Sequence, residues 1–83
     1  MTHHVRVLFF ASLAGRLGVR EAALQVPAGT TVDQAVGELI RRHPGLEETR
    51  DGLAYAVNLE YVAPEHALAD GDELALIPPV SGG

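Results

Sequence analysis

The chain contains no cysteine. Without a thiol it can form no disulfide, thiolate nucleophile or zinc–thiolate site, and no side chain can carry a persulfide. Lysine is also absent, so the six basic residues are all arginines, and they do not form one run. If the chain were a protein modifier, it could therefore not be built into polymers through its own side chains.

The chain also has no long apolar run and no excess of basic charge. No apolar stretch is long enough to cross a bilayer, and no signal peptide opens the chain, so we expect no membrane association and a cytoplasmic location. The formal net charge of −5 argues against a nucleic acid as the main ligand. With 83 residues, 47% hydrophobic and 20% charged, the sequence is typical of one small soluble domain.

Motifs for metal, nucleotide or nucleophilic chemistry are missing as well. No spacing among the four histidines resembles a zinc site, and the dispersed glycines match neither phosphate-binding pattern. The acidic run at Asp70-Gly71-Asp72 is better explained as a tight turn. We therefore expect no metal and no cofactor bound by this chain.

One main helix is predicted from Thr30 or Thr31 to His43. Thr31 and Gln34 have the spacing of a capping box, and Pro44 disfavours a helical conformation at the residue before it. Apolar residues recur between these ends with helical spacing, at Val32, Ala35, Val36, Leu39 and Ile40. Gly37 lies within this helix, and the sequence offers no reason for it.

Alternating or β-branched segments predict five strands, at residues 5–11, 20–26, 53–57, 60–62 and 73–77. Residues 12–18 are expected to be turn-like or a short helix capped by Ser12 and ended by Gly18. Residues 46–52 are expected to be a polar connection with at most one helical turn. The resulting order, β-β-α-β-β-β, indicates an α+β fold with one helix packed across a mixed sheet.

Alternation also predicts which side chains leave the core. If Val5, Val7, Phe9, Leu74 and Leu76 face the helix, then Phe10 and Ile77 point to the opposite side of the sheet. Tyr61 is expected to join them. An exposed apolar patch of this kind usually marks a partner site. The alternative is that these side chains cover a barrel-like end of the fold.

The last six residues form a distinct segment, which divides the chain into a domain at 1–77 and a flexible, extended tail at 78–83. Pro78 and Pro79 end the last strand and hold the chain extended, since proline lacks an N–H and has a fixed φ. Val80 and Ser81 follow, and then two glycines, Gly82 and Gly83, whose lack of side chains suits a narrow space. Such a tail can present its terminal carboxylate to another protein's active site. A frayed glycine-rich terminus is the alternative.

Three segments resemble one known family: V-R-V-L-F-F-A at the start, A-V-N-L-E-Y-V in the middle and D-G-D-E-L-A-L-I-P-P-V-S-G-G at the end. They are similar to the small, sulfur-carrying subunit of molybdopterin synthase, and the resemblance covers nearly the whole chain. It implies a ubiquitin-like β-grasp fold.

The resemblance also implies a mechanism and its partners. An E1-like activating enzyme uses ATP to adenylate the carboxylate of Gly83, and a sulfur donor then displaces AMP to leave a thiocarboxylate. The tail enters the large synthase subunit, where its sulfur attacks the cyclic pyranopterin precursor. The catalytic side chains are expected on that subunit, within a heterotetramer. At positions matching Phe10, Tyr61 and Ile77, family members pack on the large subunit.

Other functions stay open from the sequence. The carrier could deliver sulfur to another acceptor, in thiamine synthesis or tRNA thiolation. It could instead be a modifier that transfers its Gly83 acyl group to lysines of target proteins, or a β-grasp binding module with an inert tail.

Overall fold

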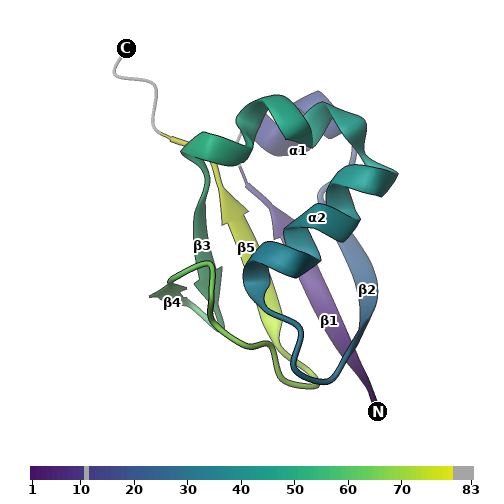
Figure 1. Cartoon of the computed structure of the whole chain (residues 1–83). Helices are drawn as coiled ribbons and strands as arrows, with labels where there is room; N and C mark the ends of the chain where they lie inside the picture. The colour runs from purple at the N-terminus through teal and green to yellow at the C-terminus, as the bar shows by residue number, and fades with distance from the viewer. Residues whose placement is uncertain (11, 80–83) are drawn as a thin grey trace.

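The computed structural model describes residues 1–10 and 12–79 (Figure 1). Five strands and three helical segments follow one another within these residues. In chain order they are β1 (Thr2–Phe9), α1 (Ser12–Leu17), β2 (Glu21–Pro27), α2 (Val32–Arg42), the 3₁₀ helix η1 (Pro44–Gly52), β3 (Ala54–Val57), β4 (Glu60–Val62) and β5 (Glu73–Ile77).

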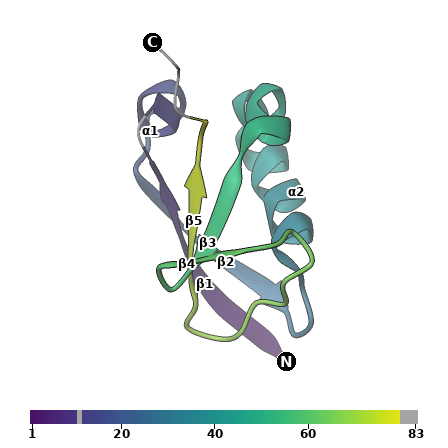
Figure 2. The same ribbon diagram turned by 90° about the vertical axis from the view of Figure 1, so that its left-hand side faces the viewer.

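The strands form one mixed sheet in the order β2-β1-β5-β3-β4. The first and last strands, β1 and β5, pair in parallel at its centre, while the other neighbours are antiparallel. Helix α2 packs along one side of this sheet, which makes two layers (Figure 2). This is the predicted α+β architecture, a ubiquitin-like β-grasp.

Helix α2 begins and ends where its sequence predicts. The Thr31 hydroxyl accepts the Gln34 N–H at 3.3 Å, and the Gln34 side chain accepts the Thr31 N–H at 3.0 Å, so both halves of the capping box are present. His43 forms the C-cap, and its N–H donates to the Leu39 carbonyl at 2.7 Å. An alanine Cβ at Gly37 would meet no atom within 4 Å, so packing does not explain this glycine.

The core lies between α2 and the sheet. All five strand residues predicted to face the helix are buried, with exposed fractions of 4% or less, and four residues of the helix stripe are fully buried. These are Val5, Val7, Phe9, Leu74 and Leu76 of the sheet, and Val32, Ala35, Val36 and Leu39 of the helix. The alternation and the 3.6-residue spacing therefore assigned the core correctly.

The first strand starts and ends earlier than predicted. It spans Thr2–Phe9 and not residues 5–11, and its first residues pair with the end of β2, from Thr2 opposite Pro27 to His4 opposite Gln25. The prediction was wrong because His3 and His4 have little strand propensity of their own. Their pairing partner is distant in sequence.

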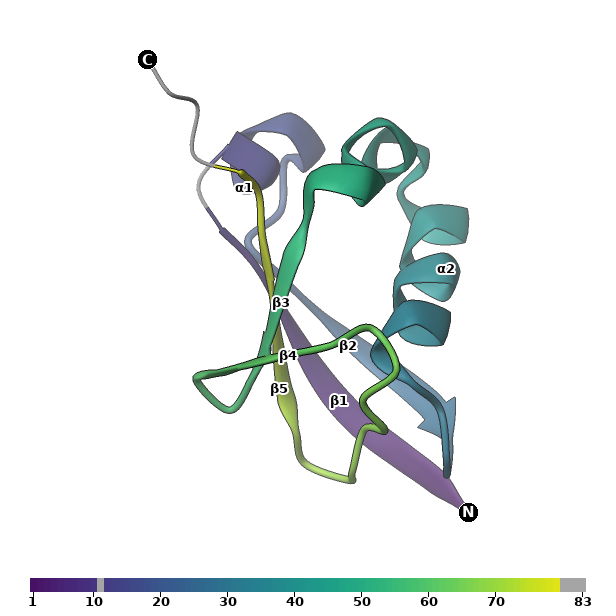
Figure 3. The ribbon, with the colours of Figure 1, turned by 60° about the vertical axis from the view of Figure 1, so that its left-hand side comes forward.

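Residues 12–18 take the second of their two predicted forms, a short helix ended by Gly18, whereas residues 44–52 are more helical than predicted. Helix α1 begins at Ser12 itself, and Gly18 ends it, with φ of 75° and an N–H bonded to the Ala14 carbonyl at 2.9 Å. The prediction of at most one helical turn after Pro44 was wrong, because η1 has 9 residues. Burial of Leu46 holds this otherwise polar segment against the core. The segment connects the end of α2 to the start of β3 (Figure 3).

A two-residue turn joins β3 to β4. Val57 pairs with Glu60, so Asn58 and Leu59 form the turn, and both have positive φ, at 51° and 72°. Positive φ at both central residues is what a type I′ hairpin turn requires. The strands predicted at residues 53–57 and 60–62 leave these same two residues between them, and Gly71 at φ 86° lies in the predicted Asp70–Asp72 turn.

Candidate partner-binding face

The side of the sheet opposite α2, here called the outer face, carries an apolar row. Strand register puts Leu8 opposite Ala75, Ala75 opposite Ala56, and Ala56 opposite Tyr61, across four neighbouring strands. The two central alanines are small, whereas Tyr61 at one end is 77% exposed. The row therefore offers apolar surface that the chain itself does not cover at its Tyr61 end.

A second apolar group lies one step further toward the end of β5. Ile77 pairs with Ala54 and is half-buried, and Phe10 continues from β1 with its N–H donating to the Leu76 carbonyl at 3.2 Å. The Phe10 side chain is 43% exposed. Strand register thus places Tyr61 and Ile77 on the outer face, and Phe10 directly follows β1 at its apolar end; contact of these three side chains with a partner stays a prediction.

The charged part of the outer face begins where β5 begins and extends along β2 to Glu21, which pairs with Leu8. The Arg6 guanidinium lies 2.7 Å from Glu21 and 3.6 Å from Glu73, and the hydrogen bond and charge of Glu21 raise the pKa of Arg6. Because β1 and β5 are parallel, both strands run from this charged end toward Phe10 and Ile77. The face is therefore polar where β5 begins and apolar where it ends.

A shallow notch of about 450 Å³ adjoins Phe10 at that apolar end. Its walls come from β1, α1 and the segment before β2, and they comprise Leu8, Phe9, Phe10, Ala14 and Arg20. An apolar floor with an arginine at its margin suits an apolar side chain that has a carboxylate nearby.

The tail segment starts directly from the apolar end. Pro78 follows Ile77 without interruption and is half-buried, and Pro79 is exposed. The other residues predicted to thread into a partner, Val80, Ser81 and Gly82, lie outside the described residues, as does the predicted reactive Gly83.

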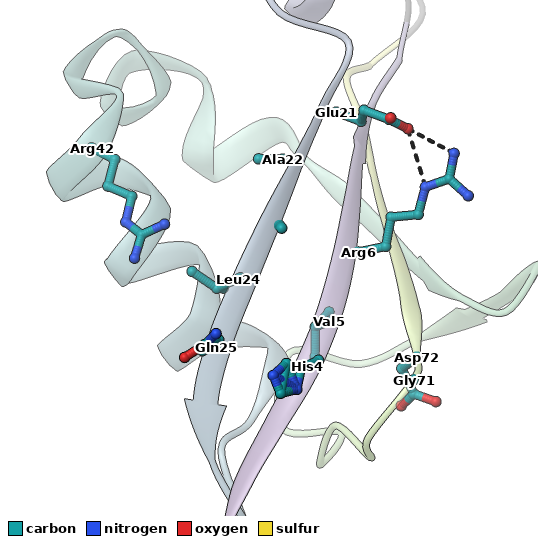
Figure 4. Close-up of a pocket in the computed structure, with 11 residues that line it drawn as sticks. His4, Val5, Arg6, Glu21, Ala22, Leu24, Gln25, Arg42, Gly71 and Asp72 are labelled. Carbon is teal, nitrogen blue, oxygen red and sulfur yellow. Dashed lines mark hydrogen bonds and ion pairs between the residues drawn. The ribbon is translucent and has the colours of Figure 1, made fainter.

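A second depression, of about 720 Å³, wraps around the edge strand β2. Figure 4 shows Arg42 of α2 on one side of this strand and the hydrogen-bonded pair Arg6–Glu21 on the other. Its remaining lining side chains include His4, Gln25 and Leu24. These groups form no nucleophile–base pair, and we assign them no chemistry.

One buried titratable group, the phenol of Tyr55, lies on the core side of the sheet. Tyr55 is 7% exposed, and burial raises the pKa of its phenol, which the neighbouring Arg50 guanidinium partly lowers. Arg50 is itself bound to Asp33 at 2.9 Å, and this hydrogen bond raises its pKa. The cluster joins η1, α2 and β3, which is a structural role.

The described residues hold no group of three His, Cys, Asp or Glu side chains that could bind a metal ion. Among the helices of that same part of the chain, none has the length and apolar character needed to cross a membrane.

Sequence reasoning missed part of the outer face. Leu8 was not included in the predicted patch, although strand alternation places it on the same side as Phe10. The alanines at 54, 56 and 75 carry no signal of their own, because small apolar residues occur on either side of a sheet. Only the pairing register of the strands places these alanines on the outer face.

Comparison with known proteins gives consistent matches along the whole chain. The human molybdopterin synthase sulfur carrier subunit is 43% identical over 82 residues, which cover 95% of this chain and 93% of that protein. The corresponding subunit of Arabidopsis thaliana is 39% identical over 79 residues, covering 95% of this chain and 82% of that protein.

Solved structures agree with these matches. The crystal structure of Haloferax volcanii small archaeal modifier protein 1 has a TM-score of 0.85 and 37% identity, over 94% of this chain and 99% of that one. A subunit in the complex of subunits 1 and 2 of the molybdopterin-converting factor of Helicobacter pylori has a TM-score of 0.65 and 26% identity. That match covers 96% of this chain and 99% of the other.

The model of the ThiS family matches residues 7–83. This span includes the apolar end of the outer face, both prolines and the terminal glycines. The chain therefore belongs to the ThiS family.

Proposed function

We propose that this chain is the sulfur carrier subunit of a molybdopterin synthase, with the terminal carboxylate of Gly83 as the group that carries sulfur. One observation carries the proposal: the segment leading to Gly83 leaves the sheet at the apolar end of the outer face, beside Phe10 and Ile77. Binding to the large subunit and presentation of the terminal carboxylate would thus use neighbouring parts of one surface. The names of the related carrier subunits support it.

Activation of the carboxylate comes first in this proposal. A Gly83 oxygen attacks the α-phosphorus of ATP on an E1-like enzyme, and pyrophosphate leaves. The acyl adenylate is a good electrophile because AMP is a good leaving group, which a free carboxylate oxygen is not. The carrier itself supplies only the tail, so ATP binds the activating enzyme and no cofactor binds this chain.

Sulfur then replaces AMP. The sulfur of a sulfide-level donor attacks the acyl carbon, AMP departs with the bonding electron pair, and a thiocarboxylate remains on Gly83. A thiocarboxylate is an anionic sulfur nucleophile that requires no cysteine, and the chain has none.

The final transfer takes place on the large synthase subunit. The outer face docks on that subunit, the tail enters its active site, and the thiocarboxylate sulfur bonds to a carbon of the cyclic pyranopterin precursor as an oxygen substituent of that carbon leaves. Water then cleaves the acyl–sulfur bond, which leaves the sulfur on the pterin and returns the carboxylate of Gly83. Two carriers serve one heterotetramer, and the catalytic side chains belong to the large subunit. The Helicobacter pylori complex, in which subunit 1 binds subunit 2, supports such a partner.

The intact mass of the protein tests this function. After incubation with ATP, an E1-like enzyme and a sulfur donor, we expect a gain equal to one oxygen exchanged for sulfur. A variant that lacks Gly83, and one extended by a residue after it, should show no gain while their thermal unfolding is unchanged. A wild-type protein that gains no sulfur, or a shortened variant that does, would contradict the proposal.

A protein modifier is the second candidate, because small archaeal modifier protein 1 of Haloferax volcanii is 42% identical to this chain over 82 residues and has a similar fold. In that case the Gly83 adenylate would acylate a lysine of a target protein. The two functions differ in product: the modifier yields lysine-linked conjugates, whereas the carrier yields a thiocarboxylate and forms a stable complex with a large subunit. Copurification with that subunit would favour the synthase over thiamine synthesis or tRNA thiolation.

A further inference from the structure

Gly52, the last residue of η1, lies against the first residues of the tail segment. A Cβ at this position would lie 3.2 Å from Cγ and 3.3 Å from Cδ of Pro79, closer than Cβ contacts normally come. Among the described glycines this approach is unique. At Gly45, in the same 3₁₀ helix, a Cβ would meet Leu17 at an ordinary 3.6 Å, and the other five would meet nothing within 4 Å.

Strand register explains why these two residues meet. Ala54 of β3 pairs with Ile77 of β5, so the next antiparallel positions outward are Leu53 opposite Pro78 and Gly52 opposite Pro79. Proline has no N–H and cannot continue the ladder. The pairing therefore ends with the Pro79 ring resting on the Gly52 backbone.

Backbone conformation does not account for the glycine. The described glycines with positive φ are Gly18, Gly29 and Gly71, so Gly52 has a backbone that alanine can adopt. In a helical segment, alanine would even be favoured over glycine by about 1 kcal/mol. What glycine provides at position 52 is space for the Pro79 ring.

We propose that Gly52 is a positioning residue for sulfur transfer, because it sets the direction in which Pro79 sends the tail away from the outer face. The inference rests on the proposed function. Because Pro78 and Pro79 have fixed φ angles, a change in the position of Pro79 at this contact also changes the direction in which the chain continues. The four residues that follow Pro79 can reach at most about 14 Å when extended, so the direction at Pro79 decides where the Gly83 carboxylate can go.

An alanine at position 52 would force Pro79 to move by a few tenths of an ångström or to turn its ring away. A smaller fraction of the free carrier molecules would then hold the tail in the direction that the activating enzyme binds. The apparent affinity of the enzyme for the carrier falls in proportion to that fraction. The rate after binding should be little changed, because Gly52 is far in sequence from the reacting carboxylate, and of the two described tail residues a Cβ there would meet Pro79.

The experiment compares Gly52→Ala with Gly45→Ala as substrates of an E1-like enzyme. Initial rates of pyrophosphate release are measured against carrier concentration, together with thermal unfolding. For Gly52→Ala we expect KM to rise about fivefold with kcat within about twofold of wild type. Gly45→Ala should match wild type in both. Neither substitution should lower the Tm.

A rescue variant separates positioning from other effects. Pro79→Ala removes the Cγ–Cδ ring atoms that a Cβ at position 52 would strike, so Gly52→Ala should raise KM far less in the Pro79→Ala background. The inference would be overturned if KM were unchanged for Gly52→Ala, or if KM rose equally for Gly45→Ala. It would also be overturned if the rise in KM followed a lowered Tm, or if the same fivefold rise occurred in the Pro79→Ala background. If wild type itself releases no pyrophosphate and gains no sulfur, the proposed function fails, and this positioning role fails with it. If wild type reacts and Gly52→Ala behaves identically, only the positioning role fails.

Discussion

The phenol of Tyr55 shows how one buried titratable group makes stability depend on pH. Its pKa lies above the ordinary value of 10.0, mainly because burial disfavours the phenolate. In the unfolded chain the phenol ionises near pH 10, whereas in the folded protein it stays protonated to higher pH. The contribution of the Tyr55 phenol to the free energy of unfolding is therefore complete below pH 10. It is lost as the pH rises through the pKa that the phenol has in the folded protein.

Tyr55→Phe removes this ionisation, so its Tm should fall less steeply than that of wild type above about pH 10. Thermal unfolding recorded between neutral and alkaline pH measures the difference. Tyr61→Phe is the matched control, because Tyr61 is 77% exposed and the variant keeps the buried phenol. Tyr61→Phe should retain the steep alkaline fall. Parallel curves for wild type and Tyr55→Phe would show that the buried phenol does not couple to folding.

At the scale of elements, the sequence predicted correctly the helices and strands whose sequence signals lie in or next to the element itself. Thr31 and Gln34 mark the start of α2, Pro44 marks its end, and alternation in β1 and β5 identifies their core faces. All these signals lie within an element or within two residues of its ends. The capping box then appears in the structure with both of its hydrogen bonds.

Elements whose stability depends on distant partners were predicted less well. The first residues of β1 are ordered by pairing with β2, and η1 is held by one fully buried leucine in a polar segment. The contact between Gly52 and Pro79 is also non-local, since it follows from the register of β3 and β5. Single-sequence patterns contain no register, so the predicted patch included Phe10, Tyr61 and Ile77 without the alanines beside them.

Leu46→Ala tests whether η1 is an integral part of the fold. Leu46 is fully buried, so its truncation should lower the free energy of unfolding by about 3 kcal/mol. Urea unfolding followed by circular dichroism measures this change. Glu47→Ala, at the exposed next position, should have an effect below about 0.5 kcal/mol. A small loss for Leu46→Ala would mean that η1 can separate from the core, and Gly52 would then lack a rigid support.

At the scale of the whole molecule, the two sides of the sheet have different tasks. One side packs against α2 and contains the core, while the outer face combines a charged end with an apolar end that continues into Pro78. Substitutions on the outer face should therefore weaken partner binding without lowering the free energy of unfolding, whereas core substitutions should lower the free energy of unfolding as well.

Phe10→Asp and Tyr61→Asp should each weaken the complex with a large synthase subunit about tenfold or more, because a charge would be desolvated at an apolar contact. Calorimetric titration measures the Kd. Both side chains are exposed, so the free energy of unfolding should change by less than about 1 kcal/mol. Arg41→Asp, an exposed change on α2 at the other side of the sheet, should leave the Kd unchanged. Unaltered binding by both outer-face variants would exclude this face as the docking surface.

The central position of β5 has a consequence for biosynthesis. Strands β1 and β2 can pair early during translation, and β3 and β4 form a local hairpin, but in the sheet these two pairs are joined only through β5. Residues 73–77 leave the ribosome last among the strands, so the outer face is complete only after β5 has been made. A large synthase subunit that recognises this face would therefore not bind chains that end before β5, and the order of the strands would act as a quality check on each newly made carrier.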